Sequence, residues 1–526
     1  MTEEKRIAKA AGIVGSATLV SRILGFVRDA VIAYIFGAGR DADAFFVAYR
    51  ISNLLRRLVG EGALTVSFIP IFTEELAKGS KDKARKLVST AFTFFPIILI
   101  ILTVLGIIFS KWIFEIISPG FADTPEKLEL TISLAKWMFP FLFFISLSAL
   151  AMGVLNSLKH FTAPAFSPIW FNVSVILSAF FLASQMTEPV YALAIGVVLG
   201  GLLQFVYQLP YLKRFDMLPR LNFDFSNPAI KNILLLMLPS TLGVAVYQIS
   251  IFITTRFASQ LPEGSVSYLY YADRIMEFPL GIFGVAVATA SLPSLSEHAA
   301  KKDWLKFKQS LSFAIRLVIF ISIPATVGLI ILGVPIVNIL FQRGEFSQES
   351  TYGTAFALYF YALGLASFSG ARIVASAFYS LKDTLTPVII AVITLFFNVI
   401  MALILMKPLL HGGLALATAL SSMLNFILLF LVLRKRLGGI GARDIIYSFL
   451  KVSIASLIMG IVVYSLSSWL WNMEGIILER SLTLFLTIIL GVFTFLFWVF
   501  IFKSPELKFF LDIIKKRVYR NKYLPG

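Results

Sequence analysis

Long apolar segments alternate with short polar segments along the whole chain. Windows of about 20 apolar residues recur from near residue 20 to near residue 490, and a helix of about that length spans the hydrocarbon core of a bilayer. The alternating segments of roughly ten residues that a membrane β-barrel needs do not occur. Open sheets are excluded because backbone groups in lipid need internal partners. The pattern therefore predicts an all-α polytopic membrane protein.

About 14 spanning helices are predicted by this criterion. Their approximate centres are near Val20, Leu58, Ile100, Leu142, Val175, Val197, Val244, Ile282, Phe320, Leu365, Ile393, Leu416, Leu457 and Leu490. The composition agrees, because 58% of the 526 residues are hydrophobic and only 14% are charged. A water-soluble domain could not carry so much apolar sequence without a large exposed patch.

The loops alternate between basic and less basic. The stretch KGSKDKARK at 78–86, the loop around 213–231, EHAAKKDWLKFK at 297–308 and LRKRLGGIGAR at 433–443 are basic, whereas SPGFADTPEKLE at 118–129 is net acidic. Basic loops of membrane proteins lie in the cytoplasm. We therefore expect both termini to be cytoplasmic and the helix count to be even. The net charge of +17 is thereby explained by topology, with no nucleic acid as a partner.

Two segments are similar at an offset of 224 residues. Ala48, Arg50, Ile51 and Gly60 align with Ala272, Arg274, Ile275 and Gly284. This similarity predicts two six-helix halves, at 1–222 and 223–440, related by a pseudo-two-fold axis along the membrane normal. Two additional helices at 441–503 and a tail at 504–526 complete the predicted organisation.

The tail has the pattern of a basic amphipathic helix. Ser504-Pro505-Glu506 is typical of a helix start. One face then carries Leu507, Phe510, Leu511, Ile514 and Val518, and Lys508, Lys515, Lys516 and Arg517 lie off that face. Such a helix suits the anionic cytoplasmic surface of the membrane. The alternative is a short cytoplasmic helix packed on the protein's own loops.

Charged residues also occur at bilayer depth, where each costs at least about 2.5 kcal/mol on insertion scales. They are concentrated in the first, second and eighth predicted helices: Arg22, Arg28, Asp29, Asp43, Arg50, Arg56, Arg57, Glu61, Asp273, Arg274 and Glu277. Spacing predicts that Arg274 pairs with Glu277. Asp43 is placed near the outer water, where it needs no partner. Arg22, Arg28 and Arg56 have no carboxylate at pairing distance on their own helix and are interpreted as surplus cations.

Surplus arginines in a repeated pattern predict an electropositive cavity. The planar guanidinium matches phosphate and carboxylate oxygens, so the expected ligand is an anion, with a diphosphate favoured. The alternative is that each arginine reaches toward water or ties helices together. No metal site or cofactor is predicted, since the chain has no cysteine, its three histidines are far apart in sequence, and no phosphate-binding loop motif occurs.

The same stretches resemble a known family. The run SRILGFVRDAVIAYIFGAGRDADAFFVAYRISNLLRRLVGEGALTVSFIPIF and the later run GSVSYLYYADRIMEFPLGIFGVAVATASLPSLS closely resemble the MurJ (MviN) lipid II flippases of the multidrug/oligosaccharidyl-lipid/polysaccharide exporter superfamily. SPGFADT and LQFVYQLPYLKR are also similar to the family. The resemblance extends over approximately residues 7 to 435.

This resemblance implies a helical bundle that opens alternately to the two sides of the inner membrane. It implies transport of lipid II, the undecaprenyl-diphosphate-linked disaccharide-pentapeptide, to the outer leaflet, with the last two helices forming a groove for the lipid tail. The family's cavity arginines match Arg22, Arg28, Arg56 and Arg274. Gate and cavity-support positions match Asp43, Glu61, Ser267 and Glu277, and Arg50 stands where other members have lysine.

Some members of the family resemble cation-coupled carriers. Asn398 and Thr418 match positions of such a cation site, but the seventh predicted helix, LLLMLPSTLGVAVYQISIFITT, has no acidic residue. That departure favours the alternative, in which the two side chains form hydrogen bonds between helices.

Three other functions remain open. The chain could export another polyprenyl-diphosphate-linked glycan, or a drug cation, although a cation exporter would have unpaired acids at depth. A membrane glycosyltransferase or polymerase acting on the same lipid would need a catalytic carboxylate in a sizeable outer loop. The outer loops here are short, with Asp123 and Glu126 as the candidates, so the chain is predicted not to be an enzyme. Membrane lipids and other cell-wall synthesis proteins are the further partners considered.

Overall fold

The computed structural model describes residues 3–57, 65–78, 81–224, 226–473, 475–509 and 512. Within these ranges the regular elements are helices and no strand is present. In the described part of the chain, nine helical spans are long and apolar enough to cross a membrane, and the bent pair Gln348–Leu363 and Leu365–Ser380 forms a tenth if it counts as one span. The predicted all-α polytopic membrane fold is confirmed. All the predicted helix centres except Leu58, which lies outside the described residues, fall in helical elements.

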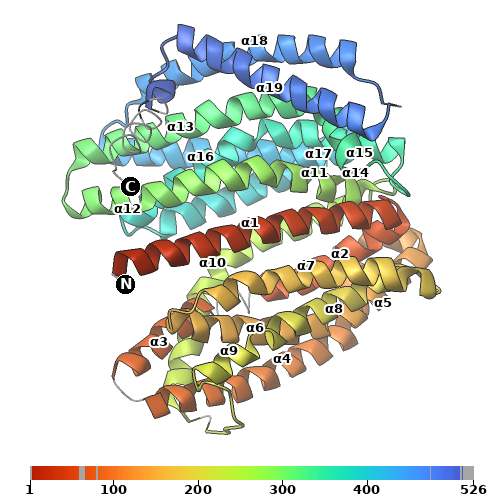
Figure 1. Cartoon of the computed structure of the whole chain (residues 1–526), viewed down its shortest axis with the longest axis vertical. Helices are drawn as coiled ribbons and strands as arrows, with labels where there is room; N and C mark the ends of the chain where they lie inside the picture. Colours follow the sequence, from red (N-terminus) through yellow and green to blue (C-terminus); the bar gives the residue numbers. More distant parts are fainter. Residues whose placement is uncertain are drawn as a thin grey trace, which may run out of the picture. The chain divides into compact units, whose positions relative to one another are not determined.

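The chain divides into two compact units, which are coloured along the sequence in Figure 1. Unit 1 consists of Met1–Ser267 and Arg343–Ser347. Its elements are α1 (Glu3–Phe36), α2 (Arg40–Leu55), α3 (Thr65–Ala77), α4 (Lys81–Ile117), η2 (Pro119–Asp123), α5 (Pro125–Met138), α6 (Pro140–Ser157), α7 (Thr162–Leu182), η3 (Ala183–Gln185), α8 (Tyr191–Val206), α9 (Leu209–Arg214) and α10 (Pro228–Ser259).

Unit 2 consists of Tyr268–Gln342 and Gln348–Gly526. Its elements are most of α11 (Ser265–Pro279), then η4 (Leu280–Gly284), α12 (Val285–Ala300), α13 (Trp304–Ile331), α14 (Gly333–Phe341), α15 (Gln348–Leu363), α16 (Leu365–Ser380), α17 (Leu385–Leu437), α18 (Ala442–Leu470) and α19 (Ile477–Ile501). Helices α18 and α19 lie side by side, and α18 packs on α13 (Figure 1).

Helix α17 contains a sharp break, which separates the eleventh and twelfth predicted spans. Leu410 has φ 49° and ψ −132°, a conformation that is not helical. Gly413 follows, and a Cβ there would lie 2.1 Å from the carbonyl oxygen of Leu405. Only glycine permits so close an approach of backbone to backbone.

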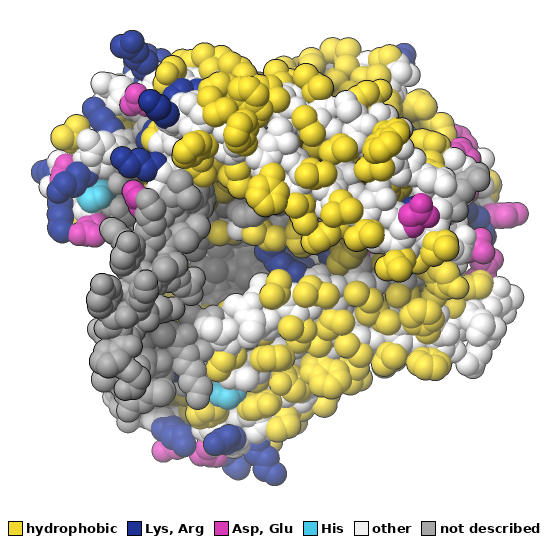
Figure 2. All heavy atoms as spheres, turned by 45° about the horizontal axis from the view of Figure 1, so that its top comes forward, with side chains coloured by type: hydrophobic (Ala, Val, Ile, Leu, Met, Phe, Trp, Pro, Cys, Tyr) yellow, Lys and Arg dark blue, Asp and Glu magenta, His cyan; other side chains and the backbone are white. Residues whose placement is uncertain are grey.

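Each unit has its own apolar core and also exposes apolar side chains. Phe68, Phe72 and Leu142 are fully buried in unit 1, and Phe307 and Phe378 are fully buried in unit 2. On the face shown in Figure 2, hydrophobic side chains predominate, and most of the visible charged side chains lie toward the edges. Burial in lipid explains such a surface, because lipid does not penalise apolar exposure.

The two repeated segments share an unusual helical geometry. Arg56 and Arg57 lie in a π-helical turn, and the π-helical stretch Leu280–Gly284 begins at the equivalent position of the second segment. π-Turns are rare and occur mostly as single insertions in α-helices. Their recurrence at the predicted offset supports the internal repeat, and the half boundaries at 222 and 440 stay predictions.

The beginning of the C-terminal tail packs on the protein. Glu506 is 1% exposed, and its Oε1 lies 3.2 Å from Nη1 of Arg316 in α13. The rings of Phe313 and Phe509 pack with their centres 4.8 Å apart. The first turn of the tail therefore packs on the protein's own surface, as the alternative interpretation of the tail predicts. Most of the predicted amphipathic face lies outside the described residues.

Replacing Glu506 with alanine should release the tail. The change leaves the guanidinium of Arg316, which is 20% exposed, without its carboxylate, at an expected cost of about 2 kcal/mol. Limited proteolysis of the detergent-solubilised protein should then cleave the tail faster. Lys508→Ala, a change at an exposed residue two positions away, is the matched control. Equal cleavage of wild type and Glu506→Ala would contradict the anchoring role.

Asp383, in the loop between α16 and α17, should make stability depend on pH. The Thr386 hydroxyl, the Thr386 amide and Arg436 all donate to its carboxylate and lower its pKa to about 2. The folded state therefore gains stability that is fully present above pH 3.8 and is lost as pH falls through about 2. We expect Asp383→Asn to lower the unfolding temperature at pH 7 and the gap to wild type to close between pH 4 and 2. A gap that persists at pH 2 would contradict this assignment.

Candidate substrate-binding and gating residues

Arg28 is a buried cation in the C-terminal third of α1. Its side chain packs against α7, where the guanidinium lies 5.5 Å from the ring centre of Phe171. Arg28 is 9% exposed and Asp29 is fully buried. Nε and Nη2 of Arg28 donate to Oδ1 of Asp29 at 3.0 and 2.7 Å, and Nη1 donates to Oδ1 of Asn172 at 3.2 Å.

The interpretation of Arg28 as a surplus cation is therefore wrong. Its carboxylate partner is the next residue, a spacing that usually points side chains apart on a helix. The long arginine side chain overcomes this separation, and burial of both groups makes the pairing necessary. Asn172, which the sequence did not single out, fixes the arrangement because its Nδ2 also donates to the carbonyl of Ser21 at 3.1 Å.

Asp43 forms the second buried ion pair of unit 1. It lies in the first turn of α2 and is 1% exposed. The ammonium of Lys127 in α5 donates to its Oδ2 at 2.8 Å, as does the amide of Gly264 at 2.9 Å. The amide and hydroxyl of Ser267 donate to its Oδ1 at 2.9 and 2.6 Å.

The expectation that Asp43 needs no partner is wrong, because the carboxylate is removed from water and accepts four hydrogen bonds. It ties α2 to α5 and to the start of α11. The structure thus brings together two predicted gate positions, Asp43 and Ser267. The sequence does not predict Lys127 as the partner of Asp43, because Lys127 lies in a net acidic stretch that is typical of an outer loop.

Two further arginines of α2 and its continuation make polar contacts within unit 1. Nη1 of Arg50 donates to the hydroxyl of Thr255 in α10. Nε of Arg56 donates to Oδ1 of Asn53 at 2.9 Å. The side chain of Arg22 is exposed. Glu61 lies outside the described residues.

The predicted pair in the second repeat segment is present. Nη1 of Arg274 lies 3.1 Å from Oε2 of Glu277, and the side chains are 31% and 42% exposed. The prediction that these residues pair on their own helix is confirmed. Both belong to unit 2, whereas Arg22, Arg28 and Arg56 belong to unit 1.

Among the residues that the structure describes, no cluster of acidic ligands surrounds the candidate cation site. Asn398 is 3% exposed, and the hydroxyl of Thr418 donates to the carbonyl of Leu414 one turn earlier in its own helix. No group of three or more His, Cys, Asp or Glu residues placed to hold a metal occurs in the described part of the chain.

A protein-family model described as lipid II flippase MurJ matches residues 32–484. The chain belongs to this family. A probable lipid II flippase MurJ of Buchnera aphidicola subsp. Acyrthosiphon pisum is 38% identical over 497 residues, which cover 94% of this chain and 97% of the relative. The lipid II flippase MurJ of Burkholderia cenocepacia is 39% identical, covering 80% of this chain and 83% of the relative.

Solved structures agree with the MurJ assignment. A lipid II flippase MurJ in an inward closed conformation matches with a TM-score of 0.80 and 28% identity, covering 93% of this chain and 98% of that structure. An inward-facing multidrug resistance MATE transporter of the MOP superfamily has a TM-score of 0.66 at 18% identity, covering 81% of this chain and 98% of that one. The second match shows a shared fold.

Proposed function

We propose that this chain flips lipid II from the cytoplasmic to the outer leaflet by alternating access. The observation that carries the proposal is the match of the lipid II flippase MurJ family over residues 32–484. Membership in a family of flippases makes the chain a transporter and not an enzyme, which removes the glycosyltransferase alternative. The drug-cation alternative is disfavoured by the arginines at depth.

Arg22, Arg28, Arg56 and Arg274 are proposed to bind the diphosphate of the substrate. Arg28 is the best supported of the four, because Asp29 and Asn172 hold its guanidinium in one orientation. Preorganisation of this kind lowers the entropy lost on binding. The negative charge of Asp29 also offsets the positive charge of the guanidinium. The resulting affinity for a diphosphate is moderate, which transport requires because the substrate must also be released.

Asp43, Ser267 and Lys127 are proposed to hold the outer gate closed. Ser267 is the last residue of unit 1 before the chain continues into unit 2 at Tyr268. The two hydrogen bonds that Ser267 donates to Asp43 therefore hold this end of unit 1 on α2. Breaking them is proposed to accompany outward opening. Arg50, Glu61 and Glu277 are proposed to support the gate and the binding residues, and Asn398 is proposed to join helices, whereas the Thr418 hydroxyl donates within its own helix.

The protein is a multi-pass membrane protein, and we propose that it resides in the inner membrane with both termini in the cytoplasm. Contacts between loops support this topology. The basic stretch at 81–86 pairs with Asp216 and Asp224 of the next predicted cytoplasmic loop. At the opposite ends of the helices, Lys127 and Gly264 from two predicted outer loops meet at Asp43. Loops predicted to share a side thus contact one another.

Reconstituted vesicles distinguish lipid II from the remaining rival substrate, another polyprenyl-diphosphate-linked glycan. Full-length protein would be incorporated into vesicles that contain one fluorescent lipid or the other, and the fraction accessible to an external quencher would be followed. We expect fast exchange of lipid II and slow exchange of a polyprenyl diphosphate carrying an unrelated glycan. Faster exchange of the unrelated glycan would overturn the lipid II assignment.

A further inference from the structure

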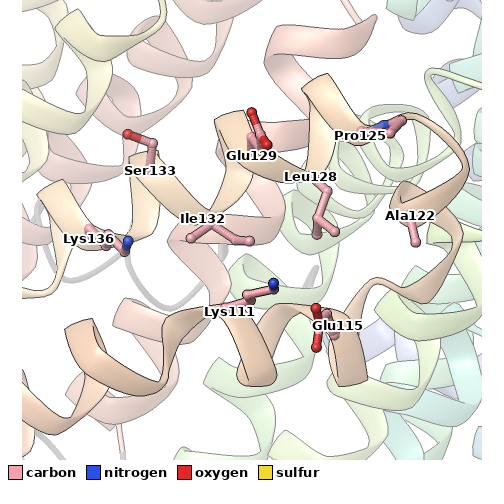
Figure 3. Close-up of a pocket in the computed structure, with 9 residues that line it drawn as sticks. All are labelled: Lys111, Glu115, Ala122, Pro125, Leu128, Glu129, Ile132, Ser133 and Lys136. Carbon is pink, nitrogen blue, oxygen red and sulfur yellow. The ribbon is translucent and has the colours of Figure 1, made fainter.

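A groove with four charged and several apolar side chains in its lining lies between the C-terminal end of α4 and the facing side of α5. It has a volume of about 530 Å³. Lys111 and Glu115 line it from α4, one turn apart, and Leu128 and Ile132 point toward them from α5 (Figure 3). Glu129 and Lys136 also belong to its lining. Both walls lie within unit 1.

The four charged side chains of the groove do not pair with one another. Lys111 and Glu115 are four residues apart, but lysine precedes glutamate, which is the weaker order for pairing on a helix. Among the described residues, none of the four charged groups forms an ion pair or a side-chain hydrogen bond. Two ammonium groups and the Glu115 carboxylate are thus available to a ligand, whereas the Glu129 carboxylate lies on the side of α5 that faces away from Lys111 and Glu115 (Figure 3).

The groove lies at the depth of the membrane–water interface. Trp112 follows Lys111 and Trp137 follows Lys136, and these indole side chains are 56% and 54% exposed. Exposed tryptophan is enriched at the level of lipid headgroups. Helix α4 begins in a basic, predicted cytoplasmic loop, so its other end faces the outer leaflet. This placement rests on the proposed topology.

An apolar surface continues from the groove toward the membrane centre. On α4, Ile108, Leu105 and Ile101 are 60%, 42% and 52% exposed. Successive residues of this set are about one helical turn apart, so they form a ridge beneath Lys111. A molecule with a charged head in the groove could lay its hydrocarbon chains along this ridge. The charged groove and the apolar ridge together match an amphiphile with a compact polar head.

We propose that this groove binds the headgroup of a zwitterionic phospholipid of the ethanolamine class in the outer leaflet. The lysine ammonium groups pair with the lipid phosphate, and the Glu115 carboxylate pairs with the lipid ammonium. The Glu115 carboxylate disfavours an anionic lipid, because it repels a headgroup that carries surplus negative charge. A choline head is disfavoured because its quaternary nitrogen has no N–H to donate to a carboxylate.

Native mass spectrometry of the purified, delipidated full-length chain tests the proposal. The probes are short-chain phosphatidylethanolamine, phosphatidylcholine and phosphatidylglycerol with identical acyl chains. We expect phosphatidylethanolamine to bind about tenfold more tightly than either of the others. Lys111→Gln and Glu115→Gln should each weaken its binding by about tenfold, whereas Lys111→Arg, which keeps the charge, should retain most of it.

Matched controls lie on exposed outer positions of unit 2. Lys407→Gln and Glu349→Gln remove the same charges away from the groove and should leave binding unchanged. Glycerophosphoethanolamine, the headgroup without chains, should not compete at the same concentration. Equal competition would assign the groove to a soluble phosphate ligand, and binding of phosphatidylglycerol as tightly as phosphatidylethanolamine would overturn the zwitterionic assignment. Unchanged binding by Lys111→Gln would overturn the site itself.

Discussion

Arg28→Ala should abolish flipping while Arg28→Ala/Asp29→Asn should restore stability but not flipping. The single change leaves the fully buried Asp29 without its cation, which costs about 3–5 kcal/mol for a buried pair. The double change removes both charges and recovers most of that loss. If Arg28 also binds the diphosphate, the double variant still lacks a charged hydrogen-bond donor, and flipping falls by about tenfold or more.

The comparison requires two measurements on the same samples. Thermal unfolding in detergent reports stability, and vesicle exchange of lipid II reports flipping. Arg443→Ala, an exposed arginine at the start of α18, is the control for loss of one positive charge. A double variant that flips at the wild-type rate would assign Arg28 a purely structural role.

Asp43→Ala should be the most destabilising of the gate changes. It leaves the ammonium of Lys127, which is 5% exposed, without a counter-charge and removes the acceptor of two amides and a hydroxyl. We expect a loss of about 3–5 kcal/mol. Ser267→Ala removes one hydroxyl bond and should cost about 1 kcal/mol.

A double-mutant cycle with Lys127→Met separates the ion pair from the remaining bonds of Asp43. Each single change leaves the other partner's charge buried and unpaired. The double change Asp43→Ala/Lys127→Met should therefore destabilise the protein less than the sum of the two single changes. Asp123→Ala, at an exposed acid of the same outer region, is the control and should change unfolding little. Additive effects of Asp43→Ala and Lys127→Met would contradict the contact as the source of stability.

Much of the fold could be predicted because one quantity, hydropathy over about 20 residues, decides where a chain spans a bilayer. The same window cannot detect where a span is broken. The break at Pro140, between α5 and α6, and the break at Gly364, between α15 and α16, depend on single residues and local packing. The centres of the spans within the described residues were therefore predicted correctly, and these two breaks were not.

The sequence predicts which charged residues belong to the site better than it predicts which residues they contact. Arg28 and Asp43 were selected because charge at depth is costly, and that argument holds for both. Their partners were missed for different reasons. Asp29 adjoins Arg28, a spacing that pairing rules for helices disfavour. The contact of Asp43 with Lys127 joins residues 84 positions apart and depends on the packing of α2 on α5, which neither segment specifies alone.

Leaflet exposure of lipid II in cells depleted of their own flippase is the most direct measurement of the central claim. The chain would be supplied as wild type or as equally expressed Arg28→Ala, and lipid II reaching the outer leaflet would be quantified. We expect wild type to restore outer-leaflet lipid II and Arg28→Ala to leave it inside. If wild type itself leaves lipid II in the inner leaflet, the account is contradicted.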